Sequence, residues 1–190
     1  MNNLTFIGMA GCGKSTLGKA LSKKLSVEFV DTDSLIEQKF AQSLEDLKID
    51  KGYKFVRFAE EGVILNLDND IQIISTGGSA VYSEKSMRYL SSFSTVIYIS
   101  TPIEIIKDRI GSGQQRGLAA PIGTSIEDVY LERKPMYERW AQITLDGMLS
   151  IDQLIDFITL EILSNENSYI LISLMKIFKY FTTNKTRSSN

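Results

Sequence analysis

The first segment that could do chemistry is a glycine-rich turn near the start of the 190-residue chain. Residues 8–15 read Gly-Met-Ala-Gly-Cys-Gly-Lys-Ser and match the phosphate-binding pattern G-x-x-x-x-G-K-[ST]. Glycines let several backbone N–H groups converge on phosphate oxygens, and the N-terminus of a following helix adds a favourable dipole. In this arrangement Lys14 reaches the β- and γ-phosphates, and Ser15 offers its hydroxyl to Mg²⁺. The motif predicts a nucleoside triphosphate site without naming the acceptor.

A second candidate is the pair Asp31 and Asp33, which ends the second predicted strand with one residue between them. At strand spacing, both side chains point to the same side. Ligands of open α/β sheets bind at the carboxyl ends of strands, where two carboxylates would repel a triphosphate unless one faces Mg²⁺ or a substrate hydroxyl. The spacing fits equally well a helix cap, with Asp33 capping a helix over Leu35–Lys39. Both interpretations stay open on the sequence alone.

The composition excludes several kinds of chemistry. The chain has no histidine and one cysteine, Cys12, so Ser-His-Asp and Cys-His nucleophiles, a structural zinc site and an internal disulfide are impossible. Its 21 basic and 23 acidic residues give a net charge of −2, which indicates no attraction to nucleic acid. Residues 1–8 lack the basic region of a signal peptide, and no apolar stretch reaches the roughly 20 residues of a membrane span. We expect a cytoplasmic protein without membrane association.

The elements that must position these residues alternate short β-rich runs with helical patterns, which is typical of a parallel sheet flanked by helices. The predicted strands are Leu4–Ile7, Val27–Val30, Ile71–Ile74, Thr95–Ile99 and Gln142–Leu145. Apolar residues at helical spacing predict helices over 17–25, 56–67, 103–110, 127–140 and 151–160. Pro102 would begin the third of these helices, and Pro135 should kink or divide the fourth.

Two segments differ from this alternation. Residues 111–124 are rich in Gly, Ala and Gln and form a long connection, which predicts a lid loop. Residues 164–190 combine an apolar stretch with a polar end, and we interpret them as an accessory tail without a catalytic role. The predicted organisation is therefore one α/β domain over residues 1–163, followed by this tail.

Six segments carry a family resemblance: GMAGCGKST, VDTD, FVRFAEE, STGGSAV, QQRGL and LERKPMYE. In this order and spacing, from about Leu4 to Ile158, the chain closely resembles the shikimate kinases. Many kinases share the phosphate-binding pattern, whereas the combination is much more specific. The resemblance implies a P-loop kinase fold, a three-layer α/β/α architecture with five parallel strands in the order 2-3-1-4-5. It also implies transfer of the γ-phosphoryl group of ATP to the 3-hydroxyl of shikimate, in aromatic amino acid biosynthesis.

The resemblance implies residues that bind the nucleotide and residues that bind the acceptor. ATP would be bound by the loop and two arginines, namely Gly11, Cys12, Gly13, Lys14, Ser15, Thr16, Arg109 and Arg116. Mg²⁺ would be held by Ser15 and Asp31. Shikimate would be bound by Asp33, Arg57, Gly77, Gly78, Ser79 and Arg133. Lys14, Asp33 and Arg116 would be catalytic, with Asp33 as the base, Arg116 closing over the phosphates and Arg109 packing near adenine.

The chemistry of these residue types agrees with that implication. A small carboxylated polyol is bound well by bidentate guanidinium groups at its carboxylate and by carboxylate acceptors at its hydroxyls. Phosphoryl transfer needs mainly positioning and positive charge, which Lys14, Mg²⁺ and Arg116 would supply. Glu60 follows Arg57 by three residues, close enough on a helix to orient it.

The chain departs from the family pattern in three places. Ser79 stands where the family usually has a third loop glycine, Gly117 replaces a lid proline, and residues 146–150 match the adenine segment poorly. Ser79 motivates an alternative, a relative that phosphorylates another polyol acid such as gluconate. A second alternative is a non-catalytic member of the family that acts through a partner. We expect a monomer.

Overall fold

The computed structural model describes residues 3–111 and 118–163. Residues 112–117 of the predicted lid, Arg116 and Gly117 among them, and the predicted tail 164–190 lie outside the described residues. The chain divides into two units, Met1–Ile151 and Asp152–Asn190. The sheet and every described candidate site residue belong to the first unit. The boundary expected after residue 163 stays a prediction.

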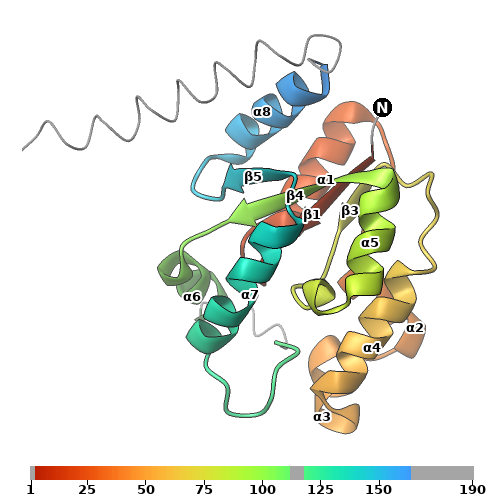
Figure 1. Cartoon of the computed structure of the whole chain (residues 1–190), viewed down its shortest axis with the longest axis vertical. Coiled ribbons are helices and arrows are strands. Elements are labelled where there is room, and N and C mark those ends of the chain that lie inside the picture. The colour runs from red at the N-terminus through yellow and green to blue at the C-terminus, as the bar shows by residue number, and fades with distance from the viewer. Residues whose placement is uncertain (1–2, 112–117, 164–190) are drawn as a thin grey trace, which may run out of the picture. The chain divides into compact units, whose positions relative to one another are not determined.

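Five parallel strands form one sheet in the order β2-β3-β1-β4-β5, which confirms the predicted topology (Figure 1). The strands are β1 (Asn3–Ile7), β2 (Phe29–Asp31), β3 (Ile73–Ser75), β4 (Ser94–Ser100) and β5 (Ile143–Asp146). The buried side chains of β1, β3 and β4 are mostly apolar, with Thr5, Ser75 and Ser94 as the polar ones, as expected for strands covered on both faces.

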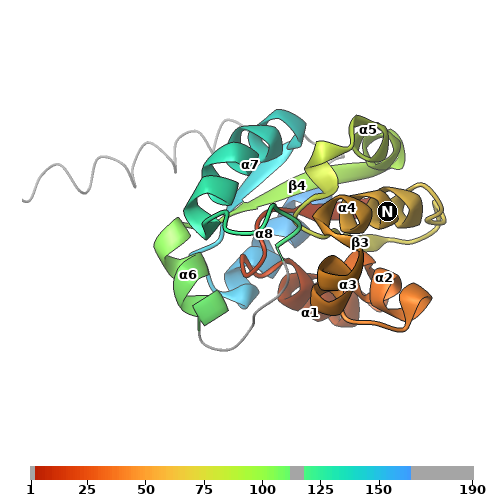
Figure 2. The same cartoon turned by 90° about the horizontal axis from the view of Figure 1, so that it is seen from below.

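Helices connect the strands, and Figure 2 shows α5 and α7 on one face of the sheet with α1 on the other. The helices are α1 (Lys14–Leu25), α2 (Thr32–Phe40), α3 (Leu44–Lys51), α4 (Tyr53–Ile64), a short 3₁₀ helix η1 (Ala80–Tyr82), α5 (Glu84–Phe93), α6 (Ile103–Gly111), α7 (Ile126–Trp140) and α8 (Ile151–Leu163). None of the helices in the described ranges is both long and apolar enough to cross a membrane.

The third strand begins two residues later than its apolar run predicts. The backbone N–H of Ile71 donates to the carbonyl of Asp68, 3.3 Å away, so Ile71 still belongs to the preceding turn. Pairing starts at Ile73, which lies opposite Leu4 of β1 and Phe29 of β2. The predicted strand was therefore placed correctly in the sheet but with the wrong first residue.

Pro102 and Pro135 were both predicted to affect a helix, and the structure differs for the two. Helix α6 begins directly after Pro102, as predicted. Helix α7 continues through Pro135 to Trp140, so Pro135 does not divide it.

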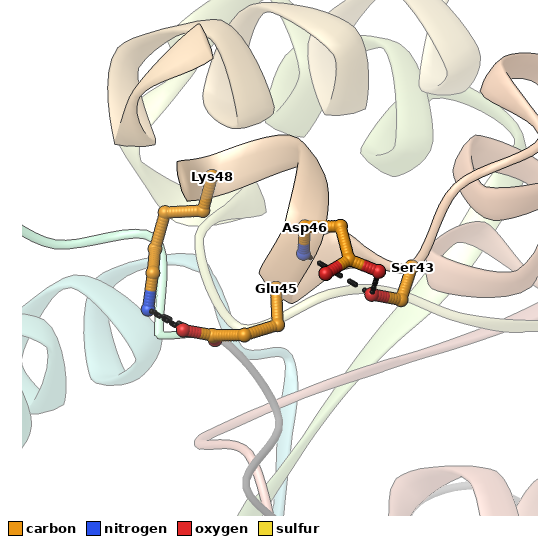
Figure 3. A network of polar contacts seen from close by, with 4 residues as sticks. All are labelled: Ser43, Glu45, Asp46 and Lys48. Atoms are coloured by element: carbon orange, nitrogen blue, oxygen red, sulfur yellow. Dashed lines mark hydrogen bonds and ion pairs between the residues drawn. The ribbon is translucent and has the colours of Figure 1, made fainter. Parts of the chain in front are cut away.

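Helices α3 and α5 are not among the predicted helices, and in α3 only Leu44 and Leu47 of its eight residues are buried. Its start is fixed by Ser43, whose hydroxyl accepts from the backbone N–H of Asp46 at 3.1 Å and donates to the Asp46 carboxylate at 2.6 Å (Figure 3). An ion pair of 2.9 Å joins Lys48 to Glu45 on the same helix. Local capping, more than apolar periodicity, defines this helix.

Two clusters of core side chains can be named among the described residues of the first unit. The larger includes Ile7 of β1, Ile74 of β3 and Tyr98 of β4, packed under α5 and α7. The smaller joins the apolar sides of α2, α3 and α4, with Ile36, Leu47, Val56, Ala59 and Val63 among its buried residues. Because Ile7 and Ile74, near the carboxyl ends of β1 and β3, belong to the larger cluster, the loops that follow these two strands start from a rigid base.

Candidate active site

The loop between β1 and α1 has the backbone shape that a phosphate-binding loop needs. Gly8, Gly11 and Gly13 all have positive φ, at 145°, 79° and 105°. A side chain at Gly8 would also meet the sulfur of Cys12 at 2.9 Å and the carbonyl oxygen of Ile99 at 3.0 Å. Glycine is therefore required at these turns, and the N-terminal N–H groups of α1 are directed to one place.

Lys14, in the first turn of α1, is 7% exposed. Its Nζ donates to the carbonyl oxygens of Gly8 and Met9, each at 2.9 Å, and lies 3.7 Å from the sulfur of Cys12. The ammonium group thus lies at the loop that precedes its own helix. Thr16 follows in the same turn and is exposed, whereas Cys12 is buried.

Asp31 has two roles in the structure. Its Oδ2 accepts from the hydroxyl of Ser15 at 2.5 Å, and its Oδ1 accepts from the backbone N–H groups of Asp33 and Ser34. Asp31 is thus the cap of α2, which starts at Thr32, and the predicted capping role of Asp33 is wrong. The helix starts earlier than expected, because the carboxylate that caps it belongs to the last residue of β2.

The glycine loop, residues Gly77–Ser79 after β3, lies between the acidic residues and the phosphate-binding loop. A Cβ atom at Gly77 would lie 2.4 Å from Asp33 Oδ1 and 2.5 Å from Glu60 Oε1. A Cβ atom at Gly78 would lie 3.1 Å from Nη1 of Arg133 and 3.4 Å from the backbone N of Ala10. The absence of side chains at both positions lets these groups approach one another.

Two hydrogen bonds hold the glycine loop in place. The backbone N–H of Gly77 donates to the hydroxyl of Thr32 at 2.9 Å, and the hydroxyl of Tyr137 donates to the carbonyl of Gly78 at 2.6 Å. The Tyr137 ring stacks on Tyr98 of the core, with centroids 5.2 Å apart. The loop is thus tied to the first residue of α2 and to α7 at once.

Glu60 of α4 is a buried acid at this loop, 2% exposed. Its Oε2 accepts a hydrogen bond from the hydroxyl of Ser79, while its Oε1 has no hydrogen-bond partner among the described residues. The expected pairing of Glu60 with Arg57 is therefore not found. Burial is the main reason that the pKa of Glu60 rises to about 7, and the nearby charge of Asp33 adds to the rise. The Ser79 hydrogen bond acts in the opposite direction.

Two arginines from different helices meet beside the glycine loop. Nε of Arg57 and Nη2 of Arg133 both donate to the carbonyl oxygen of Ala119, each at 3.0 Å. The Arg57 guanidinium carbon lies 3.5 Å from the ring centroid of Tyr82, and that of Arg133 lies 5.2 Å from it. Arg133 is 1% exposed, so a cation lies in the interior, where the neutral groups of Ala119 and Tyr82 accept its hydrogen bonds and the charge of Glu60 also acts on it.

Arg109 of α6 lies at the phosphate-binding loop. Its Nη1 donates to the carbonyl of Gly11 at 3.2 Å and lies 4.0 Å from the position of a Cβ atom at Gly13. The structure therefore brings Arg109 to the nucleotide side, while Arg116 is outside the described residues.

The described residues suit a cation that binds together with a nucleotide better than a metal held by the protein alone. The described part of the chain contains no cluster of three or more His, Cys, Asp or Glu side chains that could hold a metal ion. Ser15 and Asp31 instead offer adjacent oxygen atoms at the start of α1. Mg²⁺ typically keeps several waters and takes one or two protein oxygens plus substrate phosphates. The donor set fits that pattern.

Sequence reasoning did not identify Tyr82, Tyr137 and Ala119 as parts of the site. Tyr137 lies within the segment LERKPMYE, so a signal for it was present. Ala119 contributes only its backbone carbonyl, which no residue pattern reveals. Tyr82 is 25 positions or more from both arginines in sequence, and only the fold brings the three together.

Comparisons with known proteins agree with this geometry. The family described as shikimate kinase matches residues 10–165. A shikimate kinase of Histophilus somni is 34% identical over 165 residues, covering 82% of this chain and 94% of that protein. One from Pasteurella multocida is 36% identical over 147 residues, covering 75% of this chain and 84% of that protein.

Solved structures show the same likeness. A shikimate kinase from Acinetobacter baumannii in complex with shikimate superposes with a TM-score of 0.80 at 26% identity, covering 88% of this chain and 96% of the other. The shikimate kinase from Aquifex aeolicus gives a TM-score of 0.73 at 27% identity, covering 87% and 98%. The chain adopts the P-loop kinase fold and belongs to the shikimate kinase family.

Proposed function

We propose that this chain transfers the γ-phosphoryl group of ATP to the 3-hydroxyl of shikimate, giving shikimate 3-phosphate and ADP. Membership of the family supports ATP as the phosphate donor. The similar structure from Acinetobacter baumannii, which is in complex with shikimate, supports the acceptor. Under this proposal the chain acts as a cytoplasmic monomer.

One observation carries the proposal: the loop Gly77–Ser79 lies next to two carboxylates, to the Arg133 guanidinium group and to the phosphate-binding loop. Gly77 adjoins Asp33 and Glu60, whereas Gly78 adjoins Arg133 and the backbone of the phosphate-binding loop. An acceptor seated on this loop would have its hydroxyls near carboxylates and its carboxylate near guanidinium groups. That pattern of charge matches a carboxylated polyol.

On the nucleotide side, the loop amides at Gly11, Cys12 and Gly13 would bind phosphate oxygens together with Lys14 and Thr16. Mg²⁺, when bound, would offset the negative charge that develops on the phosphate oxygens. Ser15 and Asp31 would hold that ion, and their hydrogen bond already places both oxygens together. Arg109 would lie near the adenine, and Arg116 would close over the phosphates.

On the acceptor side, Asp33 would accept the proton of the attacking hydroxyl as a general base. Arg57 and Arg133 would bind the carboxylate, while Gly77, Gly78 and Ser79 would line the bound ring. Each guanidinium group carries five N–H donors, more than the contacts to Ala119 and Tyr82 use. Positioning of the two reactants is the main contribution that the chain would make.

The test is a coupled assay of ADP release by the purified full chain, with shikimate and with gluconate as acceptors. We expect turnover with shikimate. Lys14→Met and Asp33→Asn should each lower kcat by roughly 100-fold or more, since each removes a charge that acts in the transition state. Lys107→Met is the matched control, because Lys107 is exposed and paired with Glu127 away from the site.

The outcomes separate the alternatives. Turnover with gluconate alone would overturn the proposed acceptor. ATP binding without phosphate transfer to either acid would favour the non-catalytic interpretation.

A further inference from the structure

Tyr82 contacts both arginines of the site. It ends the 3₁₀ helix η1, directly after the glycine loop, and is half-buried. Arg57 lies over its ring at 3.5 Å from the centroid, close enough for a strong cation–π contact. Arg133 lies 5.2 Å from the same centroid, and its Nε donates to the Tyr82 hydroxyl at 3.4 Å.

Two guanidinium groups placed this close repel each other, the more so because Arg133 is buried. Both arginines contact a carbonyl oxygen, from Ala119, and Tyr82, through its ring face and its hydroxyl, while the charge of Glu60 also attracts Arg133. The carbonyl accepts one N–H from each arginine, so it cannot by itself fix the planes of both groups. The Tyr82 ring supplies the missing restraint, since it presents a flat surface to Arg57 and an oxygen to Arg133.

We propose that Tyr82 is a specificity-determining positioning residue, which holds the Arg57 and Arg133 guanidinium groups at the spacing that one carboxylate needs. This inference rests on the proposed function, because it concerns the selection of a carboxylated acceptor. Pre-organised donors bind a carboxylate without first ordering two long side chains. Loss of Tyr82 therefore weakens acceptor binding and leaves the nucleotide side intact.

Three variants of the full chain divide the contribution of the tyrosine. Tyr82→Phe keeps the ring and removes the hydroxyl, whereas Tyr82→Leu removes both. If Tyr82→Leu does not fold, Tyr82→Met is used in its place. Tyr89→Phe is the matched control, because the Tyr89 hydroxyl bonds to Leu67 and Asn69 outside the site. All are compared by KM for shikimate, KM for ATP, and kcat.

The KM for shikimate should rise about 10- to 30-fold in Tyr82→Leu or Tyr82→Met, and about 2- to 4-fold in Tyr82→Phe. The KM for ATP should not change in any of them, and Tyr89→Phe should match the wild type throughout. A residue with a merely structural role would instead lower kcat or thermal stability without this selective rise. The smaller rise of the KM for shikimate in Tyr82→Phe is the second result expected if Tyr82 positions the arginines.

A carboxamide analogue of shikimate supplies the decisive comparison. The wild type should prefer the carboxylate by its ratio of kcat/KM, and Tyr82→Leu or Tyr82→Met should lose most of that preference. An unchanged KM for shikimate in a folded Leu or Met variant, or an equal loss for both acceptors, would overturn the inference. Failure of the wild type to use shikimate at all would instead overturn the proposed function.

Discussion

At the scale of single residues, the buried pair of Glu60 and Ser79 distinguishes this site. The third loop glycine of the family pattern is replaced by a serine, whose hydroxyl is turned toward Glu60. Ser79 therefore does not simply narrow the space for a substrate. It supplies a donor to a carboxylate that has lost contact with water, and it lowers the pKa that burial raises.

This arrangement makes the stability of the protein depend on pH. The pKa of Glu60 is about 7 in the folded chain and near 4.5 when unfolded, so the folded state binds more protons between these values. Stability from this group is complete below about pH 4.5 and is lost as the pH rises through about 7. The loss amounts to at most about 3 kcal/mol.

Glu60→Gln removes the titration while keeping the shape of the protonated acid. The free energy of unfolding of Glu60→Gln minus that of the wild type should therefore increase from pH 5 to pH 8. Urea unfolding of both proteins at four pH values measures it, and all other titrating groups cancel in the difference. A difference that stays constant over this range would show that Glu60 is ionised throughout.

At the scale of elements, the sequence predicted best what a local pattern encodes. The glycine spacing and the strand before it located the phosphate-binding loop, since positive φ values at Gly11 and Gly13 need glycine. Apolar runs located all five strands but placed the starts of β2 and β3 two residues too early, in β3 because a turn extends to Ile71. A cap at Asp33 stayed open as an alternative, because spacing alone does not tell which of the two aspartates ends the strand and caps α2.

What the sequence could not predict depends on contacts between distant elements. Tyr82 joins arginines of α4 and α7, and Ser79 bonds to Glu60 of α4. Helix α3 was not predicted, because most of its residues are charged and its start depends on a cap.

That cap gives a prediction for α3. Ser43→Ala removes the acceptor of the Asp46 N–H, so the free energy of unfolding should fall by about 1 kcal/mol, while Ser43→Asp should restore most of it. Thermal unfolding of the three proteins measures this effect. Both variants should keep the wild-type KM for shikimate and ATP, as Ser43 contacts none of the candidate site residues in the described structure. A large change in KM would show that α3 belongs to the site.

At the scale of the whole molecule, strand order explains why residues far apart in sequence form one site. β1 lies between β3 and β4, and β2 lies beside β3. The parallel direction of the strands places the ends of β1, β2 and β3 at one edge, so the phosphate-binding loop, Asp31 and the glycine loop become neighbours. Helices α4 and α7 then add the two arginines from either side of that loop.

This arrangement predicts the effect of shortening the chain. All candidate site residues lie between Gly8 and Arg133, and the family match ends at residue 165. Deletion of residues 166–190 should therefore leave kcat and both KM values within a few-fold of the full chain. The ADP-release assay measures this effect, with circular dichroism to confirm that the shortened chain is folded. A folded chain without turnover would mean that this segment completes the site, and an unfolded one would mean that it completes the fold.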